Sequence, residues 1–235
     1  MKSAFMIDFQ VCRSMLRQQF VSAIIIALVI AMPLGNLYAI VPTVTLAVAV
    51  SAGFSVMALD EQNSWEAFRA ALPVTRRGIM FGRALFIAAV TLAAMLVGVV
   101  ASAVVSQAFP LIDATWGQIM EMGPEGYVFE AAPMVLSCGF SLVILGVVMC
   151  VTMPLVAKYG MTKAIRFIPL AMCAVGVTVA CVVGSMSVFS GLTSALEAWF
   201  ATSPVPVGLF LAVAAVCLFA VGAVLASRLY QRREF

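Results

Sequence analysis

Long stretches without a charged residue divide this chain into a few apolar blocks. The runs that contain no Asp, Glu, Lys or Arg are 18–59, 84–112, 131–157, 167–196 and 198–227. A helix that crosses the hydrocarbon core of a bilayer needs about 20 predominantly apolar residues. Four of the runs hold one such helix each and the first is long enough for two, so the pattern predicts six transmembrane helices.

The first run is divided by residues that favour a turn. Pro33, Gly35 and Asn36, with Pro42 beyond them, are typical of a short connection between two helices. A single helix over the whole run would place the N-terminal bases on the side opposite to all later ones, which is unfavourable. We therefore expect spans over about 19–36, 40–59, 80–107, 133–156, 167–189 and 206–227.

With six spans, the basic residues gather on one side of the membrane. They lie before the first span, in the loops after the second and fourth spans, and in the tail: Lys2, Arg13, Arg17, Arg69, Arg76, Arg77, Arg83, Lys158, Lys163, Arg166, Arg228, Arg232 and Arg233. The loops on the other side carry only acids: Asp113, Glu121, Glu125, Glu130 and Glu197. Because loops rich in Lys and Arg stay in the cytoplasm, we expect both termini there.

Composition agrees with a membrane-embedded chain. Hydrophobic residues make up 64% of the sequence and charged residues 10%, which excludes an ordinary soluble domain. Only helices and closed barrels satisfy their backbone polar groups in lipid, and the apolar runs lack the strict alternation of a barrel. We expect one all-α transmembrane domain over residues 1–235. The bases form only short clusters next to the spans, so a nucleic-acid partner is not expected.

The segment before the first span has helical periodicity of its own. Phe5, Phe9, Cys12 and Leu16 recur at the spacing of one helix face. This predicts an amphipathic helix over about 4–18 that lies in the cytoplasmic interface. The alternative is that these residues are simply the polar start of the first span.

The loop between the second and third spans contains a second short amphipathic pattern. Asn63 and Glu66 have the spacing of a capping box, and Trp65 and Phe68 share one face of the helix that would follow. Pro73 disfavours helical geometry before it and would end that helix. We expect a surface helix at the cytoplasmic mouth, with an ordinary connector as the alternative.

Basic residues flank the cytoplasmic ends of the spans. Thr75 is placed to cap the third span, and Gly160 is placed to end the fourth. The residues expected to anchor these ends at the membrane surface are Arg76, Arg77, Lys158, Lys163 and Arg166.

The absence of common catalytic and metal-binding motifs reduces the number of functions that the chain could have. The chain has no histidine, no HExxH motif and no GxxxxGK[ST] phosphate loop, so neither a metal site nor an ATPase site of its own is expected. No ionisable residue falls well inside a predicted span, which disfavours a proton-coupled carrier and a membrane enzyme. If the chain moves a solute, the energy comes from another protein. An ATP-independent carrier or a membrane scaffold subunit remains the alternative.

Three stretches together resemble the membrane permease subunits of ABC-2-type exporters, in the bacterial branch associated with peptide and drug export. The first contains Asp60-Glu61, two aromatic residues and Leu72-Pro73-Val74-Thr75-Arg76. The second runs from Pro154 through Lys158-Tyr159-Gly160 to Lys163-Ala164-Ile165-Arg166. The third is the tail with Ser227, Tyr230 and Arg233-Glu234-Phe235.

This resemblance implies a permease of a bacterial cytoplasmic membrane that works as a dimer, identical or paired with a sibling. It also implies a cytoplasmic ABC ATPase as partner, which would hold ATP and magnesium, and the export of peptides, drugs or other amphipathic compounds. The residues that the resemblance assigns to ATPase coupling are Asp60, Glu61, Trp65, Glu66, Phe68 and Arg69.

Overall fold

The described part of the chain is helical. The structure, a computed structural model, describes residues 2–34, 37–62, 75–116, 128–164, 166–169, 173, 199 and 202–231. Its elements are α1 (Lys2–Leu34), the 3₁₀ turn η1 (Leu37–Ala39), α2 (Ile40–Gln62), α4 (Arg76–Trp116), α5 (Ala131–Tyr159) and α8 (Pro204–Gln231). These residues contain no strand, which confirms the predicted all-α class.

Among the described residues, 5 helices are long and apolar enough to cross a membrane. Their apolar segments are Met6–Val29, Leu37–Leu59, Arg77–Ala108, Ala131–Tyr159 and Pro204–Gln231. They correspond to the first four predicted spans and the sixth. The predicted fifth span, 167–189, lies largely outside the described residues, so the count of six stays a prediction.

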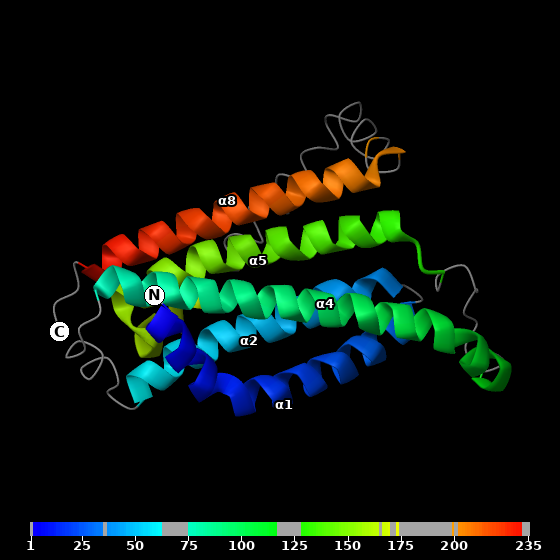
Figure 1. The fold of residues 1–235 in the computed structure, drawn as a ribbon, viewed down its shortest axis with the longest axis horizontal. Helices are drawn as coiled ribbons and strands as arrows, with labels where there is room; N and C mark the ends of the chain where they lie inside the picture. Colours follow the sequence, from blue (N-terminus) through cyan, green and yellow to red (C-terminus); the bar gives the residue numbers. More distant parts are fainter. Residues whose placement is uncertain are drawn as a thin grey trace.

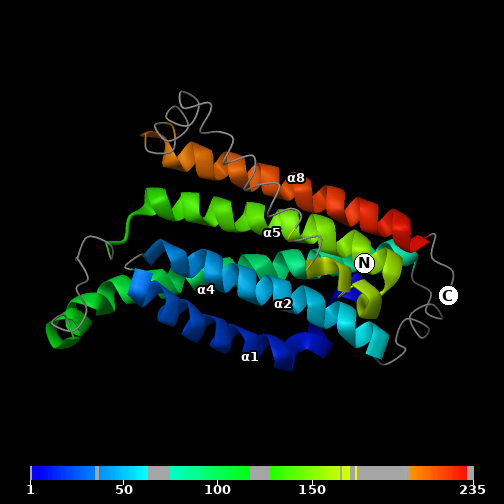
Figure 2. The ribbon, with the colours of Figure 1, turned by 180° about the vertical axis from the view of Figure 1, so that it is seen from behind.

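The helices form a bundle with both chain ends at one end of it. α1 and α4 run in one direction, whereas α2, α5 and α8 run in the other (Figures 1 and 2). The start of α1 and the last turn of α8 therefore lie at the same end, as an even number of spans requires. The exposed bases Arg77, Lys158 and Arg228 also lie on helix turns at this end, which we call the basic end.

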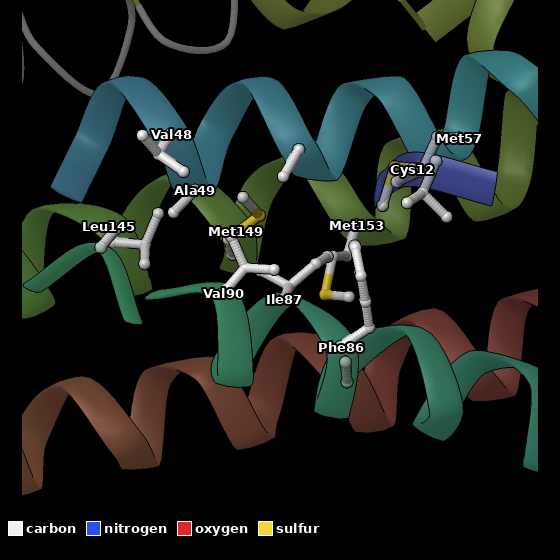
Figure 3. Packing of buried hydrophobic residues seen from close by; sticks show 14 of the residues in the cluster. Cys12, Val48, Ala49, Met57, Phe86, Ile87, Val90, Leu145, Met149 and Met153 are labelled. Atoms are coloured by element: carbon white, nitrogen blue, oxygen red, sulfur yellow. The ribbon is translucent and has the colours of Figure 1, made fainter. Parts of the chain in front are cut away.

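α2 is the central helix of the bundle. It contacts α1, α4 and α5, and a larger share of its apolar segment is buried than of those of α1 and α8. Figure 3 shows Val48 and Met57 of α2 facing Ile87 of α4 and Met149 of α5. A Cβ at Gly53 of α2 would meet only the end of the Met149 side chain, at 3.0 Å.

Glycines bring the backbones of α5 and α8 into direct contact. A Cβ on Gly139 would lie 2.6 Å from the carbonyl oxygen of Gly208, and one on Gly222 would lie 2.7 Å from the Cα of Cys150. Between them, a Cβ on Gly146 would lie 3.0 Å from the carbonyl oxygen of Ala215. Small residues thus recur at seven-residue spacing on both helices, which is the repeat of helices that pack with a left-handed crossing.

Because residue numbers rise together along this contact, α5 and α8 are parallel. The chain leaves α5 at the basic end and enters α8 at the opposite end (Figure 1). The two described ends of this connection therefore lie at opposite ends of the bundle, and the predicted fifth span between them stays a prediction.

Side-chain hydrogen bonds hold the turn at the opposite end of the bundle. The hydroxyl of Ser137 on α5 donates to the carbonyl oxygen of Tyr38 at 2.7 Å. The hydroxyl of Ser102 on α4 donates to the carbonyl oxygen of Gly98 on its own helix at 2.9 Å, with the Leu37 carbonyl oxygen at 3.5 Å. The Tyr38 hydroxyl in turn donates to the carbonyl oxygen of Val128 at 3.0 Å. The bond from Ser137 thus ties η1 to α5, and the bond from Tyr38 ties it to the residues before α5.

The N-terminal segment and the first span form one continuous helix, whose first turns lie at an angle to the rest (Figure 1); the interfacial position of these turns stays a prediction. α1 is one helix from Lys2 to Leu34, because neither Gly nor Pro occurs before Pro33. Cys12 and Leu16 are buried as expected, but Phe9 is 43% exposed and Asp8 only 2%. The inner face of α1 therefore starts at Asp8, and this segment packs against the bundle.

Candidate functional site

The predicted coupling segment connects two helices at the basic end. α2 ends at Gln62 and α4 begins at Arg76. Trp65, Glu66, Phe68 and Arg69 lie outside the described residues. Asp60 and Glu61 fall on the last turn of α2, although their side chains are not described. The assignment of these residues to coupling therefore stays a prediction.

The start of α4 agrees with the sequence. The Thr75 hydroxyl accepts a hydrogen bond from the backbone N–H of Gly78 at 3.2 Å, and the Thr75 carbonyl accepts one from Ile79 at 3.1 Å. Thr75 is thus the N-cap of α4. Arg76 is the first residue of the helix, and Arg77 is exposed beside it.

The end of α5 turns sharply at Gly160. Its backbone has φ 76° and ψ 166°, a region that is essentially restricted to glycine, and its N–H donates to the carbonyl of Val156 at 2.9 Å. The helix therefore ends where the sequence predicts. A new helical turn follows at residues 161–164, where the N–H of Ala164 donates to the carbonyl of Gly160 at 2.9 Å.

This turn presents aromatic and basic side chains at the surface. The rings of Tyr159 and Phe167 lie with their centroids 5.7 Å apart, and Lys158 Nζ lies 4.9 Å from the centre of the Tyr159 ring. Lys158, Lys163 and Arg166 are exposed. Lys158, one of the expected membrane-surface anchors, thus lies beside an aromatic pair of the kind found at headgroup level.

A buried group of charged and polar side chains lies beneath this surface. Asp8 of α1, Arg83 of α4 and Tyr230 of α8 have exposed fractions of 2%, 4% and 4%. Arg83 interacts electrostatically with both Asp8 and Tyr230. We call these three residues the Asp8–Arg83–Tyr230 cluster.

Sequence reasoning missed this cluster. Arg83 was placed among the bases of a cytoplasmic loop at the edge of a span, and Asp8 on an interfacial helix. Asp8, Cys12 and Leu16 are four residues apart and so share one face of a helix. This spacing is the feature of the sequence that could have indicated the burial of Asp8. Its oppositely charged neighbour, however, comes from a distant helix and cannot be found from spacing.

Arg83 and Tyr230 also line a small internal cavity with methionine side chains of α2, α4, α5 and the turn at 161–164. The volume of this cavity is ≈ 10 Å³, at the lower limit of about 10–15 Å³ that a single water molecule needs. The methionines that line it are Met57, Met80, Met153 and Met161.

A larger groove lies between α4, α5 and α8. It has a volume of ≈ 210 Å³, and its lining includes Leu92, Leu145 and Phe219, with Thr91 as a residue that carries a hydroxyl. That hydroxyl donates to the carbonyl oxygen of Ile87 on its own helix at 2.7 Å. The groove therefore offers an almost wholly apolar surface and no charge.

Within the described residues, no group of three or more His, Cys, Asp or Glu side chains is arranged to hold a metal ion.

The chain matches the model of one protein family, described as ABC-2 family transporter protein, over residues 5–231. No curated protein and no solved structure is significantly similar to it. The match runs from the first turns of α1 to the last residue of α8 and so includes the whole described bundle. The chain therefore belongs to the ABC-2 family of transporter proteins, which are membrane subunits of ABC transporters.

Proposed function

We propose that this chain is the permease subunit of an ATP-driven exporter, powered by a separate ABC ATPase that holds ATP and magnesium. The observation that carries the proposal is the family match over residues 5–231, which includes every described transmembrane helix. In this proposal the basic end faces the cytoplasm of a bacterial cell, since its exposed bases follow the distribution of cytoplasmic loops. Two permease copies, identical or sibling, complete the transporter.

The exported compounds are peptides, drugs or other amphipathic molecules. The groove between α4, α5 and α8 supports this class, because its lining is apolar and uncharged. An amphipathic compound places its apolar part on such a surface and leaves its polar part near the headgroups. A strongly hydrated ion gains nothing there.

The ATPase docks on the segment between α2 and α4. This segment joins the central helix to α4, the helix that contacts both α1 and α8. A movement applied there reaches most of the bundle through two helices. Asp60, Glu61, Trp65, Glu66, Phe68 and Arg69 are the proposed contact residues.

Charge reversal tests the docking role. The Glu66→Arg/Arg69→Glu variant is co-expressed with the ABC ATPase and compared with Arg13→Glu, which reverses an exposed base of α1. We expect the first variant to lose co-purification and permease-stimulated ATP hydrolysis, and the second to keep both. Unchanged docking and stimulation in the double variant would show that the coupling assignment is wrong.

Reconstitution separates this proposal from its alternative. Vesicles that contain the permease alone are compared with vesicles that contain the permease and the ATPase, using a fluorescent amphipathic dye as the transported probe. ATP-dependent movement only in the second set supports the proposal. Equal movement in vesicles without ATPase would favour an ATP-independent carrier.

A further inference from the structure

The groove between α4, α5 and α8 lies deep in the membrane-spanning part of the bundle. Its α4 residues Ala88 and Leu92 are near the middle of the apolar segment Arg77–Ala108. Leu92 and Val216, which face each other across the groove from α4 and α8, are 54% and 67% exposed, whereas Leu145 of α5 is 3% exposed. The groove therefore has a buried floor and is open at the surface of the bundle, where an acyl chain can enter from the side.

A strip of one helix face connects this groove to the basic end. Arg77 is the second residue of α4, and its side chain is exposed. Ala88 and Leu92 follow it after about three and about four turns of 3.6 residues, so the three residues share one face of α4. Phe81, one turn after Arg77, lies on the same face and is half-buried. Apolar surface thus leads from a base at the membrane surface to the groove.

The charges at the two ends of the bundle favour an acidic head at the basic end. The guanidinium of Arg77 stands in the first turn of α4, where the partial positive charge of the helix N-terminus also attracts an anion. At the opposite end, the start of α5 carries the exposed carboxylate of Glu130, which repels an anion. A compound with an apolar tail in the groove therefore places a negatively charged head at Arg77.

The distance between Arg77 and the groove sets the length of the tail. At 1.5 Å per residue of helix, Ala88 and Leu92 lie about 16 Å and about 22 Å beyond Arg77. The hydrocarbon core of a bilayer is about 30 Å thick, so the acyl chains of one leaflet cover about 15 Å. A full-length acyl chain with its head at Arg77 reaches the near edge of the groove. A chain half as long ends about halfway.

The head has to supply the preference among compounds of this shape. Lipid tails are as apolar as leucine, so a tail gains no hydrophobic free energy when it leaves the bilayer for the groove. What the groove offers is a hollow of ≈ 210 Å³ that a flexible chain fills. Discrimination between a charged and an uncharged amphiphile therefore comes from Arg77.

We propose that Arg77 and the groove between α4, α5 and α8 form one binding site for an anionic amphiphile with a long acyl chain. The acidic head, such as a phosphate monoester, lies at Arg77, and the end of the chain lies among the groove residues. Binding needs no ATPase. The further statement that such an amphiphile is the exported compound narrows the proposed function and rests on it.

Photolabelling of the permease alone tests the site. The full chain is placed in nanodiscs of phosphatidylcholine and mixed with hexadecyl phosphate that carries a diazirine at the end of its chain. After irradiation, mass spectrometry locates the labelled peptides. We expect label on the groove residues of α4, α5 and α8, and little on α1. Unlabelled hexadecyl phosphate should displace the probe, and hexadecyl phosphocholine should displace it about fivefold less well, as expected for one base near the surface.

Two further competitors separate the head from the tail. Octyl phosphate carries the same head on a chain that is too short to reach the groove, and inorganic phosphate has no chain. At the concentration at which hexadecyl phosphate displaces the probe, we expect neither to do so. Displacement by inorganic phosphate would show a simple anion site at Arg77 and would overturn the proposal.

Matched variants test each half of the site. Ala88→Leu fills part of the groove and should lower the labelling about tenfold, whereas Ala89→Leu makes the same change at an exposed neighbouring position and should leave it unchanged. Arg77→Gln should lower the labelling about fivefold, whereas Arg13→Gln, which removes an exposed base of α1, should not. A melting curve of each variant shows that the bundle is folded, and Arg77→Gln tests the proposal without any change to the core.

The results that contradict the proposal are specific. Equal labelling of α1 and the groove, equal competition by the phosphate and phosphocholine compounds, or equal effects of Ala88→Leu and Ala89→Leu would each overturn it. The assay contains no ATPase, so its outcome is independent of the proposed function. ATP-dependent dye movement without groove labelling would refute this inference alone. Groove labelling with dye movement that needs no ATPase would refute ATP-driven export and leave the binding site standing.

Discussion

The backbone contact between α5 and α8 predicts an unusual response to the smallest possible side-chain addition. In Gly139→Ala, the new methyl group would lie 2.6 Å from the carbonyl oxygen of Gly208, 3.0 Å from its Cα and 3.1 Å from Leu211 Cβ. None of these atoms is the end of a flexible side chain. The two helices have to separate by about 0.8 Å to reach an ordinary contact distance of about 3.4 Å.

Two opposing terms set the size of the effect. Overpacking of a core costs about 1–3 kcal/mol, and a backbone obstacle places this site near the upper value. Alanine is the better helix former by about 1 kcal/mol. The net destabilisation is therefore about 2 kcal/mol, which corresponds to a fall in melting temperature of about 4–8 °C for a chain of this length.

Gly53→Ala is the matched control. Its methyl group would meet Met149 Cε at 3.0 Å and Ile87 Cδ1 at 3.6 Å, and the end of the Met149 side chain can rotate away. The gain in helix propensity then remains, so we expect a melting temperature at or slightly above that of the wild type.

Melting in detergent, followed by a thiol-reactive dye that reports exposure of Cys12 and Cys138, measures both variants. The two curves are compared with that of the wild type at one protein and detergent concentration. If Gly139→Ala melts no lower than Gly53→Ala, the close packing of α5 on α8 does not stabilise the bundle and the reasoning is refuted.

Three further predictions concern the ends of the bundle. Gly160→Ala should destabilise the protein by about 1–3 kcal/mol in the same melting assay, because φ 76° with ψ 166° is strained for any residue with a Cβ; an unchanged melting temperature would contradict this. Ser137→Ala should lower the free energy of unfolding by about 1 kcal/mol, because the 2.7 Å hydrogen bond to the Tyr38 carbonyl is lost. Tyr38→Phe should lower it by less, because the hydrogen bond of the Tyr38 hydroxyl is exposed; a larger loss for Tyr38→Phe than for Ser137→Ala would contradict this reasoning. In intact cells, a membrane-impermeant maleimide should label Glu130→Cys but not Lys163→Cys, and the opposite labelling would overturn the proposed orientation.

The positions of the described spans could be predicted because a bilayer requires an uninterrupted run of apolar residues, and such a run is visible in the local sequence. Charge-free runs of sufficient length gave the first four spans and the sixth, and Thr75 and Gly160 marked helix ends correctly. These features depend on residues that are neighbours in the chain. Capping, glycine conformation and span length all belong to this class.

The partners of the helices could not be predicted in the same way. The small residues at 139 and 146 and those at 208, 215 and 222 are visible in the sequence, but glycine and alanine are frequent throughout the chain. Which of them meet depends on the packing of the whole bundle. Asp8 and Arg83 present the same difficulty, because each reads locally as a surface residue and only their shared burial shows otherwise.

The two kinds of packing in this bundle have different mechanical consequences. Where backbones touch, as at Gly139 and Gly208, a small displacement costs a large repulsion, so α5 and α8 move together. Where methionines and a buried charged cluster fill the space, as beside Arg83, a displacement has alternatives in new side-chain packing and in hydration. The second kind lies at the basic end, next to the segment between α2 and α4. The adaptable packing therefore lies at the end of the bundle where the predicted coupling segment joins α2 to α4, and the rigid packing lies along α5 and α8.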